Sequence, residues 1–291
     1  MNLKSFAKIN LYLEVVNKRR DGYHTLRTIF ERISLADRII LKPRRDNLIK
    51  VSSDNEAVPR DEANLCFKAA KLLRDKFRPF KGLDIKIIKR IPVGAGLGGG
   101  SSNAAAVLSG LNKLWGLKLS KAKLAKFAGK VGSDTAFFVY DLPFAVGTGR
   151  GDKIKPRNIL NKVKLWHLLV VPKVHVSTPL IYKKYDHFSG LTKPVCNVKL
   201  LTSVLAKKSQ SYSLLKPGLL FNSLEQVTIR LYPEVRRIKD ALLQLGLDRV
   251  LMSGSGPAVF AVASSFKNAS KLAKILRNRE RTWQIFVVET V

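Results

Sequence analysis

Apolar and polar positions alternate near the start of the chain. The apolar side chains there stand mostly at odd positions, namely Leu3, Ala7, Ile9, Leu11, Leu13 and Val15. A period of two is typical of a β-strand with one buried face. We therefore predict a strand over residues 3–15, with Lys8 and Asn10 together on its opposite face.

The pattern changes along the rest of the first half. RRDGYHTL, residues 19–26, contains an Asp-Gly pair and predicts a turn. Apolar residues spaced three and four apart predict helices, whereas short apolar runs predict strands. The predicted helices are 63–77, 101–116 and 119–131, and the predicted strands are 83–91 and, joined by turns, 134–151.

The pattern restarts near residue 161. The predicted elements there are a strand at 165–176, a helix at 232–246, two strands around a Gly-Ser turn at 249–263, a helix at 270–279 and a strand at 283–291. This order of strand, helix, two strands, helix and strand is typical of half of an α+β sandwich. We therefore expect an α+β protein with two domains, 1–160 and 161–291.

Length and composition are those of a globular chain. Of the 291 residues, 46% are hydrophobic, which suffices for a substantial core. No apolar run approaches the ~20 residues of a membrane span, and Lys4 and Lys8 interrupt the apolar start, so we expect a cytoplasmic protein. Cys66 and Cys196 form no metal-ligand spacing and are expected to be buried, reduced thiols.

The formal charge of +32 allows three interpretations: a solvated surface, a basic cleft for small phosphorylated ligands, or a nucleic-acid partner. The basic residues are spread along the whole chain, without a dense tract or interleaved aromatic residues. This distribution favours the first two interpretations over a specific nucleic-acid site.

A glycine-rich segment follows the strand predicted at 83–91. IPVGAGLGGGSSNAAA, residues 91–106, contains five glycines and leads into a helix that Ser101 or Ser102 is expected to cap. Fixing five glycines costs conformational entropy, and a tight turn needs only one or two. A strand, a glycine loop and a helix N-terminus together form an anion site, so we predict that this segment binds phosphate.

Neither of the two common nucleotide loops fits this segment. Gly94, Gly96 and Gly99 match the G-x-G-x-x-G pattern of dinucleotide folds. That pattern also needs an acidic residue about 20 positions later, and residues 85–133 contain no Asp or Glu. No Gly-Lys-Ser/Thr follows the glycines, which excludes a Walker-A loop.

Asp134 is the first acidic residue after the glycine-rich segment. Phosphoryl transfer needs cations, backbone donors and a residue that accepts the proton of the attacking hydroxyl. Asp134 is a candidate for that base, and Lys8 is a candidate cation. Spacing alone leaves open whether the two side chains meet.

Several motifs resemble those of a known family. PVGAGLGGGSSNAAA resembles the phosphate loop P-x-x-x-G-L-G-G-G-S-S-N-A-A of the GHMP small-molecule kinases. AKINLYLEV at 7–15, RRDGYHTL at 19–26 and MSGSGPAVFAV at 252–262 are similar to motifs of one branch, the 4-diphosphocytidyl-2-C-methyl-D-erythritol kinases. The resemblance covers nearly the whole chain, and AKINL together with DGYH is its more specific part.

The resemblance implies a two-domain α+β architecture and an activity. The fold would combine an N-terminal domain like ribosomal protein S5 domain 2 with a ferredoxin-like C-terminal domain. The reaction would be ATP-dependent phosphorylation of the 2-hydroxyl of the methylerythritol unit, a step of the non-mevalonate (methylerythritol phosphate) isoprenoid pathway. Asp134 falls on the catalytic aspartate of the family, and Lys8 falls on the lysine beside it, which is expected to keep Asp134 ionised.

The resemblance also assigns ligand contacts. The ATP phosphate loop would comprise Pro92, Val93, Gly94, Ala95, Gly96, Leu97, Gly98, Gly99, Gly100, Ser101 and Ser102. The residues that would contact adenosine are Asn64, Lys89 and Asn103. The residues that would contact the acceptor substrate are Asn10, Tyr23, His24 and Tyr182. His24 would hydrogen-bond the cytosine edge, and Tyr23 and Tyr182 would cover its faces. Mg²⁺ is expected with ATP, with Ser101 or Ser102 as a candidate ligand.

The chain departs from the family after the catalytic aspartate, where Thr135-Ala136 replaces the usual Val-Pro. The departure removes a proline from a turn beside the base but removes no functional side chain. Another GHMP kinase, of the homoserine or mevalonate type, would keep the loop but has no use for DGYH. An RNA-binding protein on the same fold would need neither Asp134 nor an intact loop. A monomer and a homodimer are both compatible with the sequence.

Overall fold

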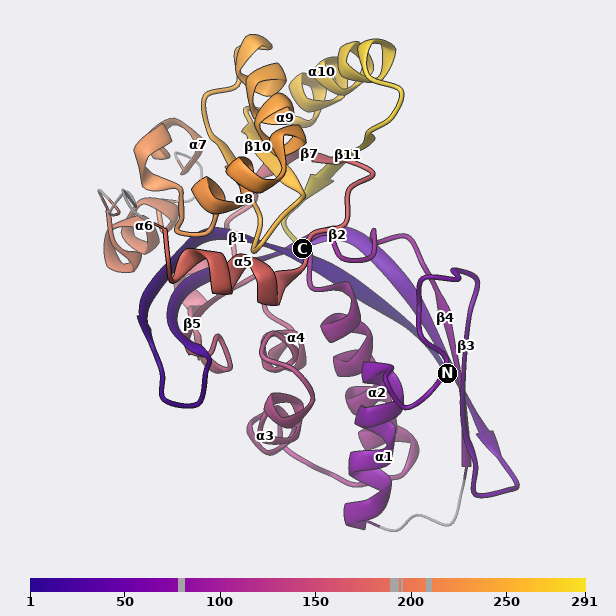
Figure 1. The fold of residues 1–291 in the computed structure, drawn as a ribbon. Coiled ribbons are helices and arrows are strands. Elements are labelled where there is room, and N and C mark those ends of the chain that lie inside the picture. The colour runs from indigo at the N-terminus through magenta and orange to yellow at the C-terminus, as the bar shows by residue number, and fades with distance from the viewer. Residues whose placement is uncertain (78–81, 189–193, 195, 208–210) are drawn as a thin grey trace.

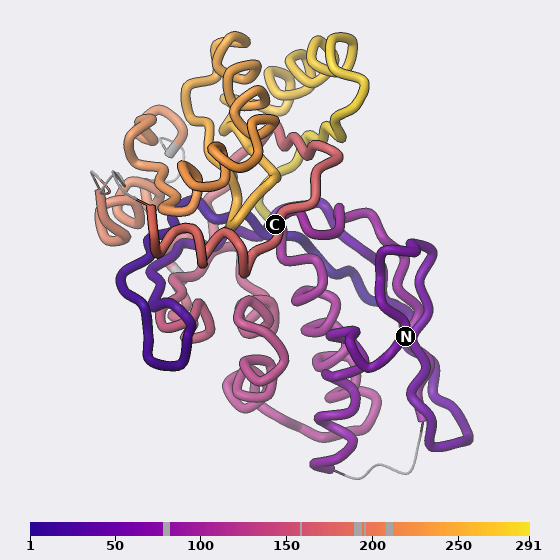
Figure 2. Tube along the Cα trace, in the orientation of Figure 1, coloured from indigo at the N-terminus to yellow at the C-terminus, as the bar shows by residue number. Residues whose placement is uncertain are grey.

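The computed structural model describes residues 1–77, 82–188, 194, 196–207 and 211–291. Figure 1 shows two lobes, the lower built mainly from the first half of the chain and the upper from the second half. Figure 2 shows the N-terminal hairpin spanning the lower lobe, from the N-terminus to the turn that joins its two strands.

The first sheet is built around this long hairpin. Its strands are β1 (Asn2–Lys18), β2 (His24–Arg44), β3 (Ile49–Ser53), β4 (Gly82–Ile88), β5 (Phe144–Gly149), β6 (Lys153–Pro156) and β8 (Phe221–Asn222). The main order is β3-β4-β2-β1-β8, and β5 pairs with both β2 and β6. The predicted turn joins β1 to β2, with Gly22 in the left-handed region at φ 79°.

The second sheet has four antiparallel strands in the order β11-β7-β10-β9. Its strands are β7 (Trp166–Val171), β9 (Val250–Met252), β10 (Val259–Ala263) and β11 (Gln284–Glu289), and its two covering helices are α9 (Pro233–Gln244) and α10 (Phe266–Arg279). The order β7-α9-β9-β10-α10-β11 is the predicted sequence of strands and helices. This half is therefore ferredoxin-like, as expected.

The remaining helices cover the first sheet or lie between β7 and α9. Those of the first lobe are α1 (Leu65–Phe77), α2 (Gly99–Leu114), α3 (Lys121–Val131) and α4 (Thr135–Tyr140). Those after β7 are α5 (Thr178–Tyr185), α6 (Val198–Leu205), α7 (Ser211–Leu214) and α8 (Glu225–Leu231), with a short 3-10 turn η3 (Pro217–Leu219). Another 3-10 turn, η1 (Asn158–Leu160), precedes β7. In Figure 1, α5 lies at the junction of the lobes.

Three large apolar clusters of the described residues hold these layers together, beside a small fourth one around Phe30 and Phe137. In the first lobe, Leu108 and Leu111 of α2 pack into the same cluster as Leu41 of β2. In the second lobe, α9 and α10 pack against the sheet. The third cluster contains Ile9 of β1 together with Phe260 of β10, so it joins the two lobes by direct contact.

The chain passes from the first sheet to the second near the predicted domain boundary. Strand β6 of the first sheet ends at Pro156, and β7 of the second begins at Trp166. However, β8 comes from the second half and pairs in parallel with β1 at Tyr12 and Leu13. The boundary near residue 160 stays a prediction, because the second half contributes a strand to the first sheet.

Two local predictions were wrong. Residues 135–140 of the predicted strand region form α4, and only the later part of that region forms β5. The helix predicted from Ser101 begins instead at Gly99, and its N-cap residue is Gly98, so no serine caps it.

Two other expectations about the chain can be compared with the structure. Cys66 and Cys196 are buried and free, as predicted. Within the described ranges, none of the helices combines the length and apolar character needed to cross a membrane.

Helix α2 should lose its support when its buried face is truncated. Leu111 is fully buried in the cluster beneath α2. Leu111→Ala should therefore lower the free energy of unfolding by ~2–5 kcal/mol. Lys113→Ala, at an exposed position of the same helix, should change it by less than ~0.5 kcal/mol. Urea unfolding curves measure both values, and equal midpoints for the two variants would contradict this packing.

Candidate active site

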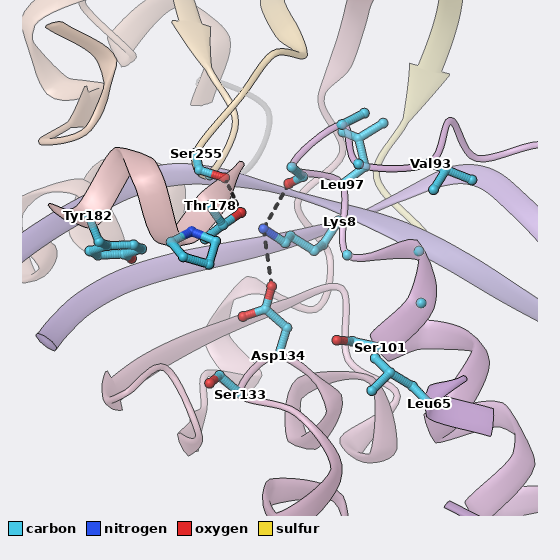
Figure 3. A pocket seen from close by; sticks show the side chains of 18 of the residues that line it. Lys8, Leu65, Val93, Leu97, Ser101, Ser133, Asp134, Thr178, Tyr182 and Ser255 are labelled. Carbon is cyan, nitrogen blue, oxygen red and sulfur yellow. Dashed lines mark hydrogen bonds and ion pairs between the residues drawn. The ribbon is translucent and has the colours of Figure 1, made fainter. Parts of the chain in front are cut away.

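A cleft of about 1070 Å³ is lined by residues of both lobes. All predicted site residues line it except Ser102. The Ser102 side chain is buried and accepts a hydrogen bond from Ser5 Oγ at 2.7 Å. Figure 3 shows the centre of the cleft, with Lys8 between Asp134 and Leu97, Tyr182 to one side and Ser101 to the other.

The glycine loop, defined as Pro92–Gly98, leads directly into helix α2. The backbone N–H of Ser102 is the first of this helix to bond within it, to Gly98 O at 2.9 Å. The first N–H groups of a helix have no intrahelical acceptor, and they carry a partial positive charge. Gly99, Gly100 and Ser101 line the cleft at this end. Such an arrangement can hold an anion, and phosphate binding at this segment stays a prediction.

Two of the glycines are required by the protein itself. A Cβ on Gly96 would lie 2.2 Å from the carbonyl oxygen of Ser253, in the turn between β9 and β10. A Cβ on Gly98, which has φ 68°, would lie 3.0 Å from the Lys8 side chain. At these two positions glycine is needed because other segments of the protein pack closely against the backbone. The sequence alone suggested that only a phosphate would approach it. Gly100 has ordinary contacts, so its space remains open to a ligand.

Lys8 and Asp134 meet at the centre of the cleft. Lys8 Nζ lies 3.3 Å from Asp134 Oδ2, and it donates hydrogen bonds to Asn10 Oδ1 at 2.7 Å and Gly96 O at 2.9 Å. The Lys8 residue is only 4% exposed, whereas 29% of the Asp134 side chain is exposed. A buried ammonium needs such partners because an unpaired buried charge is strongly destabilising. The carboxylate remains accessible to a substrate.

Backbone hydrogen bonds close the turn that carries Asp134, in which Thr135-Ala136 stand in place of Val-Pro. Asp134 precedes α4, and its carbonyl accepts a hydrogen bond from Phe137 N at 3.2 Å. Thr135 N donates to Gly132 O at 3.2 Å, and both replaced residues are buried. The Asp134 side chain makes no capping bond to its own helix, so its oxygens face the cleft and Lys8.

The three residues predicted to contact adenosine line the cleft and are tied to the surrounding chain. Asn64 precedes α1, and its Oδ1 accepts a hydrogen bond from Cys66 N at 2.8 Å. Lys89 Nζ and Asn103 Nδ2 both donate to the carboxylate of Asp37, a buried residue of β2. Sequence analysis did not single out Asp37.

His24 is fixed by an acidic residue that sequence analysis missed. Its Nε2 lies 2.6 Å from Asp186 Oδ1, and the Tyr182 ring stacks on its imidazole at 4.9 Å between centroids. Because a carboxylate only accepts hydrogen bonds, Nε2 is the donor, and a neutral imidazole in this tautomer has Nδ1 as an acceptor. Asp186 follows Tyr182 by four residues, about one helical turn, and this spacing was the available signal.

The carboxyl of Asp186 is held in its charged form. Burial raises its pKa, but hydrogen bonds from Lys18 and His24 outweigh that effect, and the pKa lies below the ordinary value. The phenol of Tyr182 is neutral, because burial raises its pKa.

Tyr23 occupies the rim of the cleft. Its ring is 53% exposed, and the Arg150 guanidinium lies over it at 4.9 Å from the ring centroid. The two predicted aromatic rings therefore do not face each other across an open gap for a base, since Tyr182 stacks on His24 and Tyr23 stacks under Arg150. Arg150 was also missed from the sequence.

The charge of the cleft suits a polyphosphate ligand. The lining cations are Lys8, Lys18, Lys89, Arg150 and Lys183, and the lining carboxylates are Asp134 and Asp186. Among the residues described, no three His, Cys, Asp or Glu side chains group to hold a metal ion. Mg²⁺ usually takes only one or two protein oxygens beside phosphates and water, so this donor set fits an ion carried by a nucleotide.

Comparisons with known proteins agree with this geometry. Residues 64–141 match the family described as GHMP kinases N terminal domain, and residues 203–281 match GHMP kinases C terminal. The chain is 44% identical to 4-diphosphocytidyl-2-C-methyl-D-erythritol kinase of Bacillus velezensis, an alignment that covers 94% of this chain and 92% of the relative. It is 43% identical to the protein of that name from Bacillus subtilis, with the same coverage.

Solved structures give the same result. A crystal structure of 4-(cytidine 5'-diphospho)-2C-methyl-D-erythritol kinase aligns with a TM-score of 0.80 and 33% identity, covering 99% of both chains. Mevalonate kinase of Methanococcus jannaschii aligns with a TM-score of 0.72 but only 16% identity, so it shares the fold alone. From its matched domains and its near full-length relatives, the chain belongs to the GHMP kinase family and, within it, to the 4-diphosphocytidyl-2-C-methyl-D-erythritol kinases.

Proposed function

We propose that this chain transfers the γ-phosphate of ATP to the 2-hydroxyl of 4-diphosphocytidyl-2-C-methyl-D-erythritol, a step of methylerythritol phosphate isoprenoid synthesis. The observation that carries the proposal is the Lys8–Asp134 pair, 3.3 Å apart, facing a cleft with a helix N-terminus on one side and His24 on the other. We expect the reaction to take place in the cytoplasm.

Asp134 acts as the general base. Its carboxylate accepts the proton of the 2-hydroxyl while the hydroxyl oxygen attacks the γ-phosphorus, and the bond from that phosphorus to the oxygen of ADP breaks. Lys8 stabilises the negative charge of the carboxylate through their ion pair. The N-terminus of α2 and the glycine loop hold the phosphate oxygens. Lys8, fixed by Gly96 and Asn10, orients the base and the acceptor.

The cytidine end of the acceptor is read by the His24 cluster. With the Nε2 proton bound to Asp186, a neutral imidazole at this position would present Nδ1 as an acceptor. The exocyclic amino group of cytosine is a donor and matches it, whereas the carbonyl at the same place in uracil does not. Tyr23, with Arg150 on one face, and Tyr182, with His24 on one face, would each offer the base the other face of the ring. Homoserine and mevalonate have no base that would use this cluster, so the geometry favours the cytidine-linked acceptor over those of other GHMP kinases.

Mg²⁺ enters with ATP in this proposal. The Ser101 hydroxyl, at the start of α2, is the protein oxygen that would complete its shell, beside phosphate oxygens and water. The ion would neutralise charge on the transferred phosphate.

The first test is ADP release from ATP and Mg²⁺ with a panel of acceptors. We expect turnover with 4-diphosphocytidyl-2-C-methyl-D-erythritol and none with homoserine or mevalonate. Replacing cytosine by uracil in the acceptor should raise KM about tenfold or more, because one donor is lost opposite His24. Equal turnover with mevalonate would contradict the assignment of the acceptor.

Asp134→Asn should remove the base and retain the nucleotide site. We expect kcat to fall ~10²–10⁴-fold while the Kd for ATP stays the same. Asp141→Asn is the matched control, because Asp141 ends α4 and pairs with Arg32 at 69% side-chain exposure. Steady-state kinetics and ATP titration measure both effects, and a wild-type kcat in Asp134→Asn would remove it from the mechanism.

His24→Ala should raise the KM for the acceptor about tenfold or more and leave the KM for ATP unchanged. Asp186→Asn, which keeps His24 but no longer fixes its tautomer, should raise the same KM by a smaller factor. Initial rates over both substrates separate the two constants. A rise in the KM for ATP alone would place His24 in the nucleotide site and contradict its assignment to the acceptor site.

A further inference from the structure

Asp37 is a buried carboxylate behind the wall of the cleft. Its side chain is fully buried on β2 and does not line the cleft. Its Oδ1 accepts hydrogen bonds from the backbone N–H groups of Arg90 at 2.7 Å and Ile91 at 2.8 Å. Its Oδ2 accepts from Lys89 Nζ at 2.5 Å and Asn103 Nδ2 at 3.0 Å. Two donors therefore point at each oxygen.

The position of Asp37 in the sheet explains the two backbone contacts. Arg38 of β2 pairs with Ile88, the last residue of β4. Beyond that pair the chain leaves the sheet toward the glycine loop, and its next amides need a new acceptor. Asp54 Oδ1 accepts from Lys89 N at 2.9 Å, and Asp37 accepts from the next two amides. Asp37 therefore holds the last part of the chain before the glycine loop.

The two side-chain contacts reach the other end of the loop. Lys89 Nζ would lie 3.2 Å from a Cβ on Gly99, the first residue of α2, so the ammonium sits beside the helix N-terminus. Asn103 lies one turn into the same helix. One carboxylate thus holds both the chain that enters the glycine loop and the helix that leaves it.

We propose that Asp37 is a positioning residue for the nucleotide half of the site, an inference that rests on the proposed kinase function. It sets the separation between the start of the glycine loop and the start of α2, and it keeps the positive charge of Lys89 beside the helix N-terminus. Its contacts include no residue of the acceptor side, such as His24 or Tyr182. Its loss should therefore weaken ATP binding and spare acceptor binding.

Asp37→Asn keeps the size of the side chain and tests this role. Either orientation of the amide turns an NH₂ donor toward two existing donors, which no rotation can satisfy. We expect the Kd for ATP to rise about tenfold or more, with the KM for the acceptor unchanged and kcat at saturating ATP within about threefold. Calorimetric titration with ATP needs no acceptor, so a failure of the proposed acceptor chemistry would be seen separately, in the wild-type turnover assay.

Glu31→Gln is the matched control. Glu31 is another fully buried carboxylate of β2, but it accepts from His167 Nε2 at 2.8 Å and Thr290 Oγ1 at 2.6 Å and lies outside the cleft lining. It should lower thermal stability and leave the Kd for ATP within about twofold. Equal losses of ATP affinity in the two variants would reduce Asp37 to a general stabilising residue and overturn the proposal, as would an unchanged Kd in Asp37→Asn.

Amide hydrogen exchange of the unmodified protein gives a second measurement if Asp37→Asn does not fold. The Arg90 amide lies beyond the end of β4 in an exposed residue, yet Asp37 accepts its hydrogen bond. We expect it to exchange as slowly as the amides within β4. Exchange as fast as that of an open loop would show that Asp37 does not hold the loop, and the proposal would fail.

Discussion

The buried ammonium of Lys8 fixes the relative positions of three segments of the chain. It comes from β1, and its partners are Asn10 on the same strand, Gly96 in the glycine loop and Asp134 before α4. Because a charge at 4% exposure must keep its partners, neither the loop nor the turn of Asp134 can shift without a large cost. A single side chain therefore fixes the position of the phosphate site relative to the base.

The glycine loop is clamped from the other lobe as well. Ser253 Oγ donates to Gly96 O at 3.2 Å, and Ala258 N donates to Ala95 O at 3.3 Å. On the acceptor side, Thr178 at the start of α5 and Ser255 share a hydrogen bond at 2.7 Å. The turn between β9 and β10 thus contacts both the nucleotide loop and the helix that carries Tyr182, which is why residues so distant in sequence line one cleft.

The sequence predicted the features that depend on the local pattern of residues. Its predictions failed where contacts between distant segments determine the structure. The alternation along β1 correctly placed Lys8 and Asn10 on one face, but it could not show that this face is also buried. Helix α4 was missed because TAFFVY is rich in aromatic and β-branched residues and too short for a helical period, whereas burial of Phe137 and Val139 makes it helical. Asp37 gave no sequence signal, because its side-chain partners Lys89 and Asn103 are far away in sequence. Asp186 gave only its four-residue spacing from Tyr182, because its partner His24 is also distant in sequence.

The two-residue strand β8 has a consequence for the order of events during synthesis. Tyr12 and Leu13 of β1 pair with Phe221 and Asn222, which the ribosome adds about two hundred residues later. At about 5–20 residues per second, this edge of β1 waits roughly 10–40 s for its partner, although the β1–β2 hairpin can already close. An unpaired strand edge is a template for pairing with other chains. The nascent protein therefore passes through a period in which the Tyr12–Leu13 edge of β1, which is paired in the finished sheet, has no partner strand.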